Sequence, residues 1–240
     1  MITSLKVLSL LLNYPTRELL DDLPALKDAV NADRLLSSKG KKMICNLCDY
    51  LEGLDLYEVQ ERYVFLFDRT RSHSLHLFEH VHGESRDRGQ ALVDLREMYL
   101  DNGFAAETTE LPDYIPLFLE YLAHQPFPEA KELLHQTAHI FEALRLRLKK
   151  KGSDYADAFA AVAELSKATP SKELLSNILA EPDDDPNDLE AMDRIWQEEV
   201  VKFGGNSGEG SCGPDRLRMQ MRAADRRPPN ETPPNTQGDH

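Results

Sequence analysis

Apolar side chains recur along most of this chain at the spacing of an α-helix. One such stripe covers residues 91–99, and two more run through residues 133–148 and 155–165. No segment of the sequence alternates apolar and polar residues over the length of a β-strand, and β-branched residues are sparse. The pattern therefore predicts an all-α fold.

Prolines and glycines divide this helical pattern into separate elements. We expect about nine to eleven helices, mapped to residues 3–13, 17–31, 33–52, 55–67, 75–82, 86–101, 114–124, 128–150, 153–167, 171–180 and 187–203. Pro116 fits only the first turn of a helix, where its missing N–H leaves no bond unmade. We therefore predict that Asp113 caps the helix that starts at residue 114.

The composition changes sharply after Phe203. Residues 204–240 contain six glycines and five prolines among 37 residues, and few large apolar side chains. Such a segment cannot offset the conformational entropy that is lost on folding. We expect a single compact multi-helix domain at residues 1–203, followed by a disordered Gly/Pro-rich tail at residues 204–240.

Acidic residues outnumber basic ones in the expected domain. The chain has 42 Asp and Glu against 28 Lys and Arg, a formal net charge of −14, and the charges of the tail cancel. This excess argues against nucleic acid or an anionic membrane surface as a partner. No apolar run approaches the roughly 20 residues that cross a bilayer, and three cysteines do not form a secreted disulfide framework. We expect a cytoplasmic protein without membrane insertion.

Two short motifs support an enzyme as the alternative interpretation. Residues 76–80, HLFEH, match a zinc-peptidase pattern in which two histidines on one helix face bind the metal. Cys45 and Cys48 form a C-x-x-C pair, although inside a helical pattern and without a second pair. Surface histidines and small apolar cysteines explain both motifs more simply. We expect no catalytic residues, metal or cofactor, and keep as the alternative a metal-dependent or redox enzyme that uses the His73–His82 cluster or Cys45/Cys48.

Charge is concentrated in two stretches. Residues 67–89 hold four acids, four arginines and four histidines, which is typical of a solvated face with weak ion pairs or of a binding surface. Residues 181–199 hold nine acids and one arginine, typical of a solubilising helix or of an attractor for a basic partner. In the second interpretation, neutralising Asp183, Asp184 and Asp185 slows association with that partner.

Residues 78–91, FEHVHGESRDRGQA, closely resemble the signature of the respiratory nitrate reductase molybdenum cofactor assembly chaperones, the delta subunit or NarJ-type family. Stretches at residues 67–69, 110–122 and 196–203 are similar to the same family. Together with the helical pattern, the resemblance covers nearly the whole expected domain. The wider class commonly has His at the position of Tyr114.

The resemblance implies an all-helical chaperone that is not an enzyme. Such proteins hold the apo catalytic (alpha) subunit in the cytoplasm, partly through its N-terminal peptide, until the molybdenum cofactor and iron–sulfur clusters are inserted. They are not part of the final reductase. The implied partners are that subunit and its N-terminal peptide, with molybdenum cofactor delivery proteins as further candidates.

We expect the client to occupy an apolar groove that is rimmed by acidic side chains. The expected client-binding residues are Phe78, Glu79, His80, His82, Glu84, Arg86, Asp87, Arg88, Glu110, Asp113, Tyr114, Phe118, Glu120 and Tyr121. Histidine ordinarily titrates close to neutral pH. We therefore also expect client affinity to depend on pH through the histidines around His80.

Overall fold

α-Helices build the fold, and a computed structural model describes it for residues 1–82, 86–105, 109–181 and 183. The elements in chain order are α1 (Thr3–Leu12), α2 (Arg17–Ala32), α3 (Ser38–Glu52), α4 (Leu56–Tyr63), the π-helical turn η1 (Val64–Asp68), the 3₁₀ turn η2 (Arg71–His73), α5 (Glu79–His82), α6 (Arg86–Asp101), α7 (Ile115–His124), α8 (Phe127–Gln136), α9 (Ala138–Lys150), α10 (Ala156–Ser166) and α11 (Lys172–Ala180). Over these described ranges the chain forms no β-strand, and an isolated bridge joins His76 to Tyr114. The predicted all-α class is confirmed.

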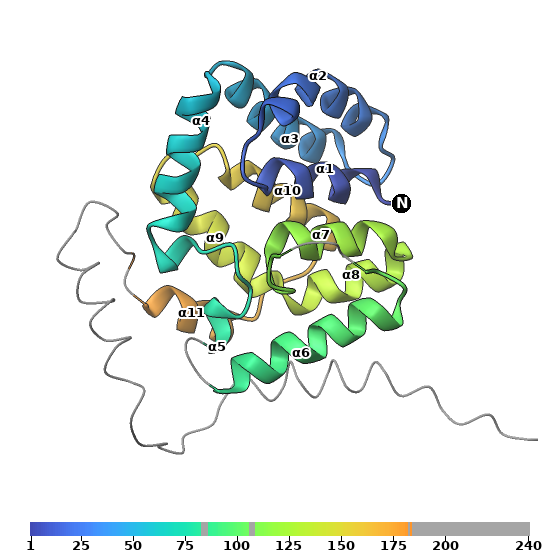
Figure 1. Ribbon diagram of the computed structural model, residues 1–240, viewed down its shortest axis with the longest axis vertical. Coiled ribbons are helices and arrows are strands. Elements are labelled where there is room, and N and C mark those ends of the chain that lie inside the picture. The colour runs from blue at the N-terminus through green and yellow to red at the C-terminus, as the bar shows by residue number, and fades with distance from the viewer. Residues whose placement is uncertain (83–85, 106–108, 182, 184–240) are drawn as a thin grey trace, which may run out of the picture.

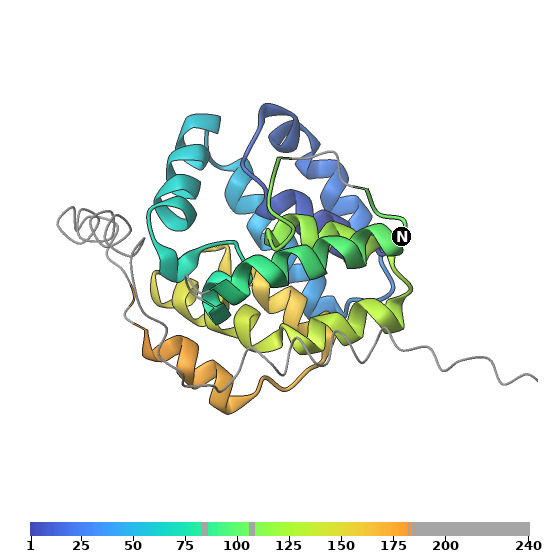
Figure 2. The same ribbon diagram turned by 60° about the horizontal axis from the view of Figure 1, so that its bottom comes forward.

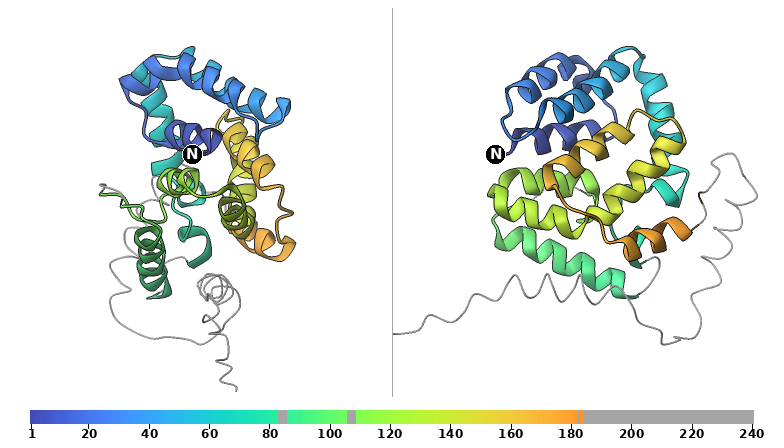
Figure 3. Two further views of the ribbon diagram at one scale, coloured as in Figure 1. Left: turned by 90° about the vertical axis from the view of Figure 1, so that its right-hand side faces the viewer. Right: turned by 180° about the vertical axis from the view of Figure 1, so that it is seen from behind.

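α1 lies near the centre of the helical assembly. It packs along α7 and contacts α2 and α10, while α10 in turn packs against α9 and α3. α2 and α3 lie side by side at one end of the molecule, and α6 lies at the opposite end, below α7 and α8 in Figure 1. α6 comes to the front in Figure 2, and the view from behind in Figure 3 shows α11 next to α9 near the same end.

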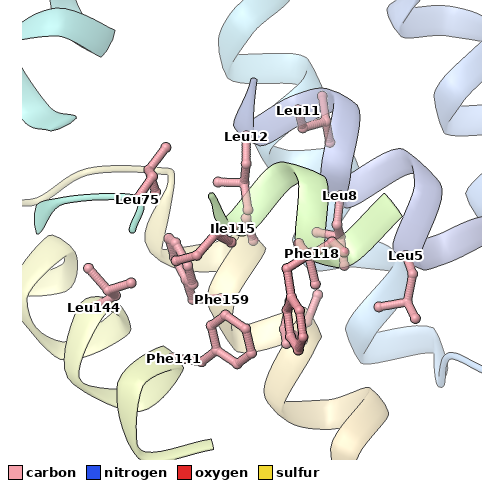
Figure 4. Close-up of a cluster of buried hydrophobic side chains, with 14 of the residues drawn as sticks. Leu5, Leu8, Leu11, Leu12, Leu75, Ile115, Phe118, Phe141, Leu144 and Phe159 are labelled. Carbon is pink, nitrogen blue, oxygen red and sulfur yellow. The ribbon is translucent and has the colours of Figure 1, made fainter. Parts of the chain in front are cut away.

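The apolar core fills the space between α1, α7, α9 and α10. The side chains that meet there are Leu5, Leu8, Leu11, Leu12, Leu75, Ile115, Phe118, Phe141, Leu144 and Phe159 (Figure 4). Each Leu or Phe that is fully removed from water stabilises the fold by about 1.5–3 kcal/mol. Because Leu75 and Ile115 belong to this cluster, the core also fixes where the chain crosses the start of α7.

The predicted helix over residues 33–52 is wrong at its start. Asp33 has an extended backbone, and its carboxylate accepts hydrogen bonds from the N–H groups of Ser4 (2.8 Å) and Leu35 (2.7 Å). α3 begins only at Ser38, after Ser37 has capped it with its side chain. A tertiary contact to α1 thus outweighs the local helical pattern.

Two other predicted helices are interrupted. The structure has two helices where one was predicted over residues 128–150, and they are separated at Thr137. The hydroxyl of Thr137 donates to the carbonyl oxygen of Leu133 at 3.0 Å. Of the prediction over residues 75–82, only α5 is helical, because residues 75–77 pair with residues 113–115 instead. The predicted helix over residues 187–203 and the tail over residues 204–240 lie outside the described residues.

Candidate functional site

The segment of residues 70–78, here called the crossing segment, runs across the start of α7. The N–H of Leu77 donates to the carbonyl oxygen of Asp113 at 3.0 Å, and the N–H of Ile115 donates to that of Leu75 at 2.7 Å. The crossing segment follows η1, a π-helical turn of the kind that often marks functional sites. It leads directly into the residues that resemble the family signature.

Asp113 fixes the crossing segment from inside the protein. Its side chain is fully buried, Oδ2 accepts the N–H of Phe78 at 3.1 Å, and Oδ1 lies 3.1 Å from Nδ1 of His76. The prediction that Asp113 caps the next helix is wrong, because the cap position of α7 is Tyr114 and lacks a side-chain cap bond. Pro116 does lie in the first turn of α7, as predicted.

His76 and His80 have opposite pKa shifts. Burial lowers the pKa of His80 to about 4, and its Nε2 donates to the carbonyl oxygen of Ser74 at 2.8 Å. Burial also disfavours charge on His76, but the hydrogen bond and the charge of Asp113 outweigh it, so that the pKa of His76 is raised. The expectation that His80 titrates near neutral pH is therefore wrong. His76 is the better candidate for such titration.

The zinc-peptidase pattern does not form a metal site. α5 begins at Glu79, so His76 and His80 do not share the face of one helix. Both rings are held by the hydrogen bonds to Asp113 and Ser74 instead. Within residues 1–82, 86–105, 109–181 and 183, no group of three or more His, Cys, Asp and Glu residues is placed to hold a metal ion.

The C-x-x-C pair lies on α3. Cys45 is half-buried, Cys48 is buried, and both are free thiols. Burial raises the pKa of both, that of Cys48 to about 12. A redox-active cysteine needs the opposite shift, because the thiolate is the reactive form. The geometry therefore supports packing for this pair.

Three of the predicted client-binding residues belong to the core. Phe78, Phe118 and Tyr121 are each exposed by 2% or less. The ring of Tyr121 packs against that of Tyr99, with 4.4 Å between their centroids. These side chains present almost no surface to a client, and the structure gives them packing roles.

The predicted charged residues do not form one rim. Arg88 pairs with Glu79 at 3.0 Å, and Lys6 of α1 pairs with Glu120. Asp87 and Glu110 are exposed. Glu84 and the side chains of His82 and Arg86 lie outside the description.

Two of the predicted residues, Glu110 and Tyr114, do lie near one another, together with Asp68 and His76. The hydroxyl of Tyr114 lies 3.0 Å from that of Tyr63, and its ring centroid lies 5.5 Å from that of His76. Burial, and then the nearby charge of Glu110, raise the pKa of the Asp68 carboxyl. Two carboxylates thus lie near one another beside a half-buried tyrosine.

Two apolar side chains extend this group. The ring of Tyr14 packs edge-on against that of Tyr63 at 5.6 Å, and 47% of Tyr14 is exposed. Leu111, next to Glu110 in the chain, is 43% exposed. We call the set the Tyr114 surface, which comprises Tyr14, Asp68, His76, Glu110, Leu111 and Tyr114.

Sequence reasoning did not single out Tyr14, Asp68 or Leu111 as contact residues. Asp68 and Leu111 lie in stretches that resemble the family, which is a signal that could have found them. For Tyr14 the available signal is weaker: an aromatic residue between Asn13 and Pro15 lies in a turn and is easily exposed. Only the fold places it beside Tyr63.

The acidic stretch after α11 is described only at its start. Oδ2 of Asp183 lies 3.6 Å from Nζ of Lys150 and 3.9 Å from that of Lys151. Its charge is therefore largely compensated within the chain. Asp184 and Asp185 lie outside the described residues, so their expected effect on association stays a prediction.

The fold and the Tyr114 surface together define an all-helical protein. Some of its polar signature residues are buried and hold the backbone, and others lie at the surface. None of the helices in the described part of the chain is long and apolar enough to span a bilayer. The buried polar groups Asp113 and His80 hold the backbone in place. These two signature-region residues therefore have structural roles.

Comparison with known proteins identifies the family. The family model described as nitrate reductase delta subunit matches residues 33–161. The chain is 38% identical over 220 residues, 91% of each chain, to the nitrate reductase molybdenum cofactor assembly chaperone NarJ of Escherichia coli (strain K12). It is 38% identical over 200 residues, 83% of each chain, to the probable nitrate reductase molybdenum cofactor assembly chaperone NarW of the same strain. The chain belongs to the nitrate reductase delta subunit family, as its resemblance predicted.

A more distant relative agrees with this assignment. The probable nitrate reductase molybdenum cofactor assembly chaperone NarJ of Bacillus subtilis (strain 168) is 32% identical over 154 residues, 62% of this chain and 80% of the other. These relatives are named as assembly chaperones or probable assembly chaperones, and none of the names describes an enzyme. The chain is accordingly a chaperone, and the enzyme alternative is set aside.

Proposed function

We propose that this chain is a cytoplasmic, system-specific chaperone of a respiratory nitrate reductase. It binds the apo catalytic (alpha) subunit, including its N-terminal peptide, and keeps it competent for insertion of the molybdenum cofactor and iron–sulfur clusters. It is not part of the final enzyme. The observation that carries the proposal is 38% identity over 91% of the chain to a protein named as such an assembly chaperone. Molybdenum cofactor delivery proteins are further candidate partners.

The Tyr114 surface is the candidate site for the client peptide. Tyr14 and Leu111 offer exposed apolar area, which suits the apolar anchors of an amphipathic peptide. Asp68 and Glu110 lie near Tyr114, and a basic side chain placed there would stabilise two carboxylates that repel each other. The surface therefore favours a peptide that carries both apolar and basic residues.

Such a site suits a chaperone that must release its client. A micromolar complex corresponds to about −8 kcal/mol. A few anchors that become buried on binding can supply this free energy, while weaker contacts around them exclude water. Release then requires no other energy source, because folding of the cofactor-loaded client can outweigh the binding free energy of so weak a complex.

Calorimetry with a synthetic peptide from the first few tens of residues of the catalytic subunit tests both proposals. The double variant Asp68→Asn/Glu110→Gln should weaken binding about tenfold, because each lost carboxylate removes one charge pair. Asp21→Asn/Asp22→Asn is the matched control, since it removes the same charge from exposed positions on α2. Equal affinities of the two variants would contradict the site. If the wild type binds neither the peptide nor the full-length apo subunit, the proposed function is wrong.

The same titration across pH 6 to 8 tests the role of His76. Its ring lies beside Asp113 and near Asp68, Glu79 and Arg88, and the pKa of His76 is raised. Protonation adds positive charge to the surface, so a basic peptide should bind more tightly as pH rises through that pKa. His76→Gln should flatten the profile. A dissociation constant of the wild type that does not change with pH would refute this dependence.

A further inference from the structure

Arg147 of α9 holds two distant parts of the chain with one guanidinium group. It is 4% exposed, and Nη1 donates to the carbonyl oxygen of Ser72 at 2.7 Å. Nη2 donates to the carbonyl oxygens of Ile178 at 2.7 Å and Glu181 at 3.2 Å. A buried cation is costly unless its donors are paired. The guanidinium of Arg147 therefore holds these three carbonyl groups close to α9.

Asp183 makes a second link between the same two parts. Its Oδ1 accepts from the hydroxyl of Ser72 at 3.2 Å and lies 3.6 Å from Nε2 of His73, a residue that is 1% exposed. Its Oδ2 faces Lys150 and Lys151. We call Ile178, Glu181 and Asp183, with their partners Ser72, His73, Arg147, Lys150 and Lys151, the α11 clasp.

The α11 clasp is connected to the Tyr114 surface through Ser74. The carbonyl oxygen of Ser74 accepts from His80, and its hydroxyl oxygen accepts from the N–H of His76 at 3.2 Å. The charge of Arg147 is one of the causes that lower the pKa of His80, after burial, and a neutral His80 makes the bond to Ser74. His76 then contacts Asp113 and Tyr114 on the other side.

We propose that the α11 clasp positions the crossing segment for client binding, with Arg147 as its positioning residue. Closed, it holds the backbone at Ser72 and so keeps His76 and Tyr114 in one arrangement. Open, it frees residues 72–76 from α9, and the Tyr114 surface loses its fixed shape. The proposal rests on the proposed function, since it concerns how the same surface is held. The clasp residues Ile178, Glu181 and Asp183 lie beyond residue 161, where the match to the family model ends.

Hydrogen exchange without client measures the clasp directly. In the full chain, Arg147→Gln should speed exchange of the amides of residues 72–80 about tenfold, while amides of α1 keep their protection. Arg145→Gln is the matched control, because Arg145 lies on the same helix and pairs locally with Glu142. Asp183→Asn removes only the second link and should give a smaller change in the same amides.

Calorimetry with the N-terminal peptide then measures the consequence for binding. Arg147→Gln should weaken the complex about fivefold to tenfold. Arg147→Lys keeps the charge but lacks the planar guanidinium that donates to several carbonyl groups, so its affinity should lie between those of Arg147→Gln and the wild type. Faster exchange with unchanged affinity would overturn the proposal, as would unchanged exchange. If Arg147→Gln does not fold, Asp183→Asn decides by the same two readouts. Failure of the wild type to bind the peptide would instead refute the proposed function, and exchange would still decide whether the clasp holds the segment.

Discussion

Asp113 accepts its side-chain hydrogen bonds from the crossing segment and not from the helix that follows it. The carboxylate is fully buried between Phe78 and His76. A buried carboxylate is tolerated only where donors surround it, so its loss leaves the N–H of Phe78 without its partner. One side chain therefore sets the path of the chain that carries the family signature.

Replacing Asp113 by Asn should separate its two roles. The amide oxygen can still accept from Phe78, but the charge beside His76 is gone. We expect unfolding to become easier by about 1–3 kcal/mol and the pKa of His76 to fall. Urea denaturation and an NMR titration of His76 measure the two effects, with Asp28→Asn at an exposed position of α2 as the control. An unchanged pKa of His76 would show that Asp113 does not raise it.

His80 should make the protein sensitive to acid. Its pKa is lowered from 6.5 to about 4 in the folded state, so between these values the unfolded chain binds a proton that the folded chain does not. Stability should therefore rise with pH across this window, by roughly 3 kcal/mol in total from this residue. His139, whose pKa burial also lowers to about 4, acts with the same sign. His76 acts with the opposite sign, because its raised pKa gives stability that is lost as pH increases.

Urea midpoints at several pH values between 4 and 7 test this. His80→Gln should reduce the slope of stability against pH, whereas His124→Gln, at an exposed position, should leave it as in the wild type. A slope unaffected by His80→Gln would contradict the shift.

Among the elements, α7 connects the core to the candidate site. Phe118 lies in the core cluster with Leu8 of α1 and Phe159 of α10 (Figure 4). Tyr114, at the N-cap position of the same helix, belongs to the Tyr114 surface. Phe118→Ala should cost about 3–5 kcal/mol of stability, because it leaves a cavity in a close-packed core. Val93→Ala on α6, where the side chain is 49% exposed, is the control and should cost far less.

Client binding by the Phe118→Ala variant separates packing from contact. We expect any loss of binding to follow the unfolded fraction and to disappear in a stabilising osmolyte. A stable, folded variant that has lost the peptide would restore Phe118 as a contact residue.

The helical elements were largely predictable, because each buries one stripe and the 3.6-residue period records it. Two of the failures occur where a contact to a distant part of the chain outweighs the local helical pattern. Residues 33–37 are drawn to α1 by the carboxylate of Asp33, and residues 75–77 pair with the start of α7. The stripe over residues 128–150 continues across Thr137, where the structure separates α8 from α9, so periodicity does not report this break.

The candidate site was predictable only in part. The resemblance located Tyr114 and Glu110, but it could not tell an exposed side chain from a buried one at Phe78. Arg147 lies among several basic residues of α9, and nothing in that local sequence distinguishes it from Arg145. Its role depends on carbonyl groups from two segments that only the tertiary fold brings together.

At the scale of the whole molecule, net charge should govern how fast the client arrives. A formal charge of −14 attracts a basic peptide over a distance of about one Debye length. We expect the association rate constant to fall about tenfold between low and high salt, while dissociation changes little. Stopped-flow fluorescence with a labelled peptide measures both rates. Equal association at both ionic strengths would show that apolar contacts alone control capture.

The pairing of the crossing segment with the start of α7 also has a topological consequence. His76 and Asp113 are 37 positions apart in sequence, yet their side chains are 3.1 Å apart, so α5 and α6 lie within an excursion whose two ends meet. The remaining helices contact one another without passing through it. An excursion of this kind can tolerate a chain break or an inserted sequence, since neither separates the ends that the fold has joined. The protein should therefore be a candidate for assembly from two fragments divided at α6. The β-bridge between His76 and Tyr114 would then form part of the interface between the fragments.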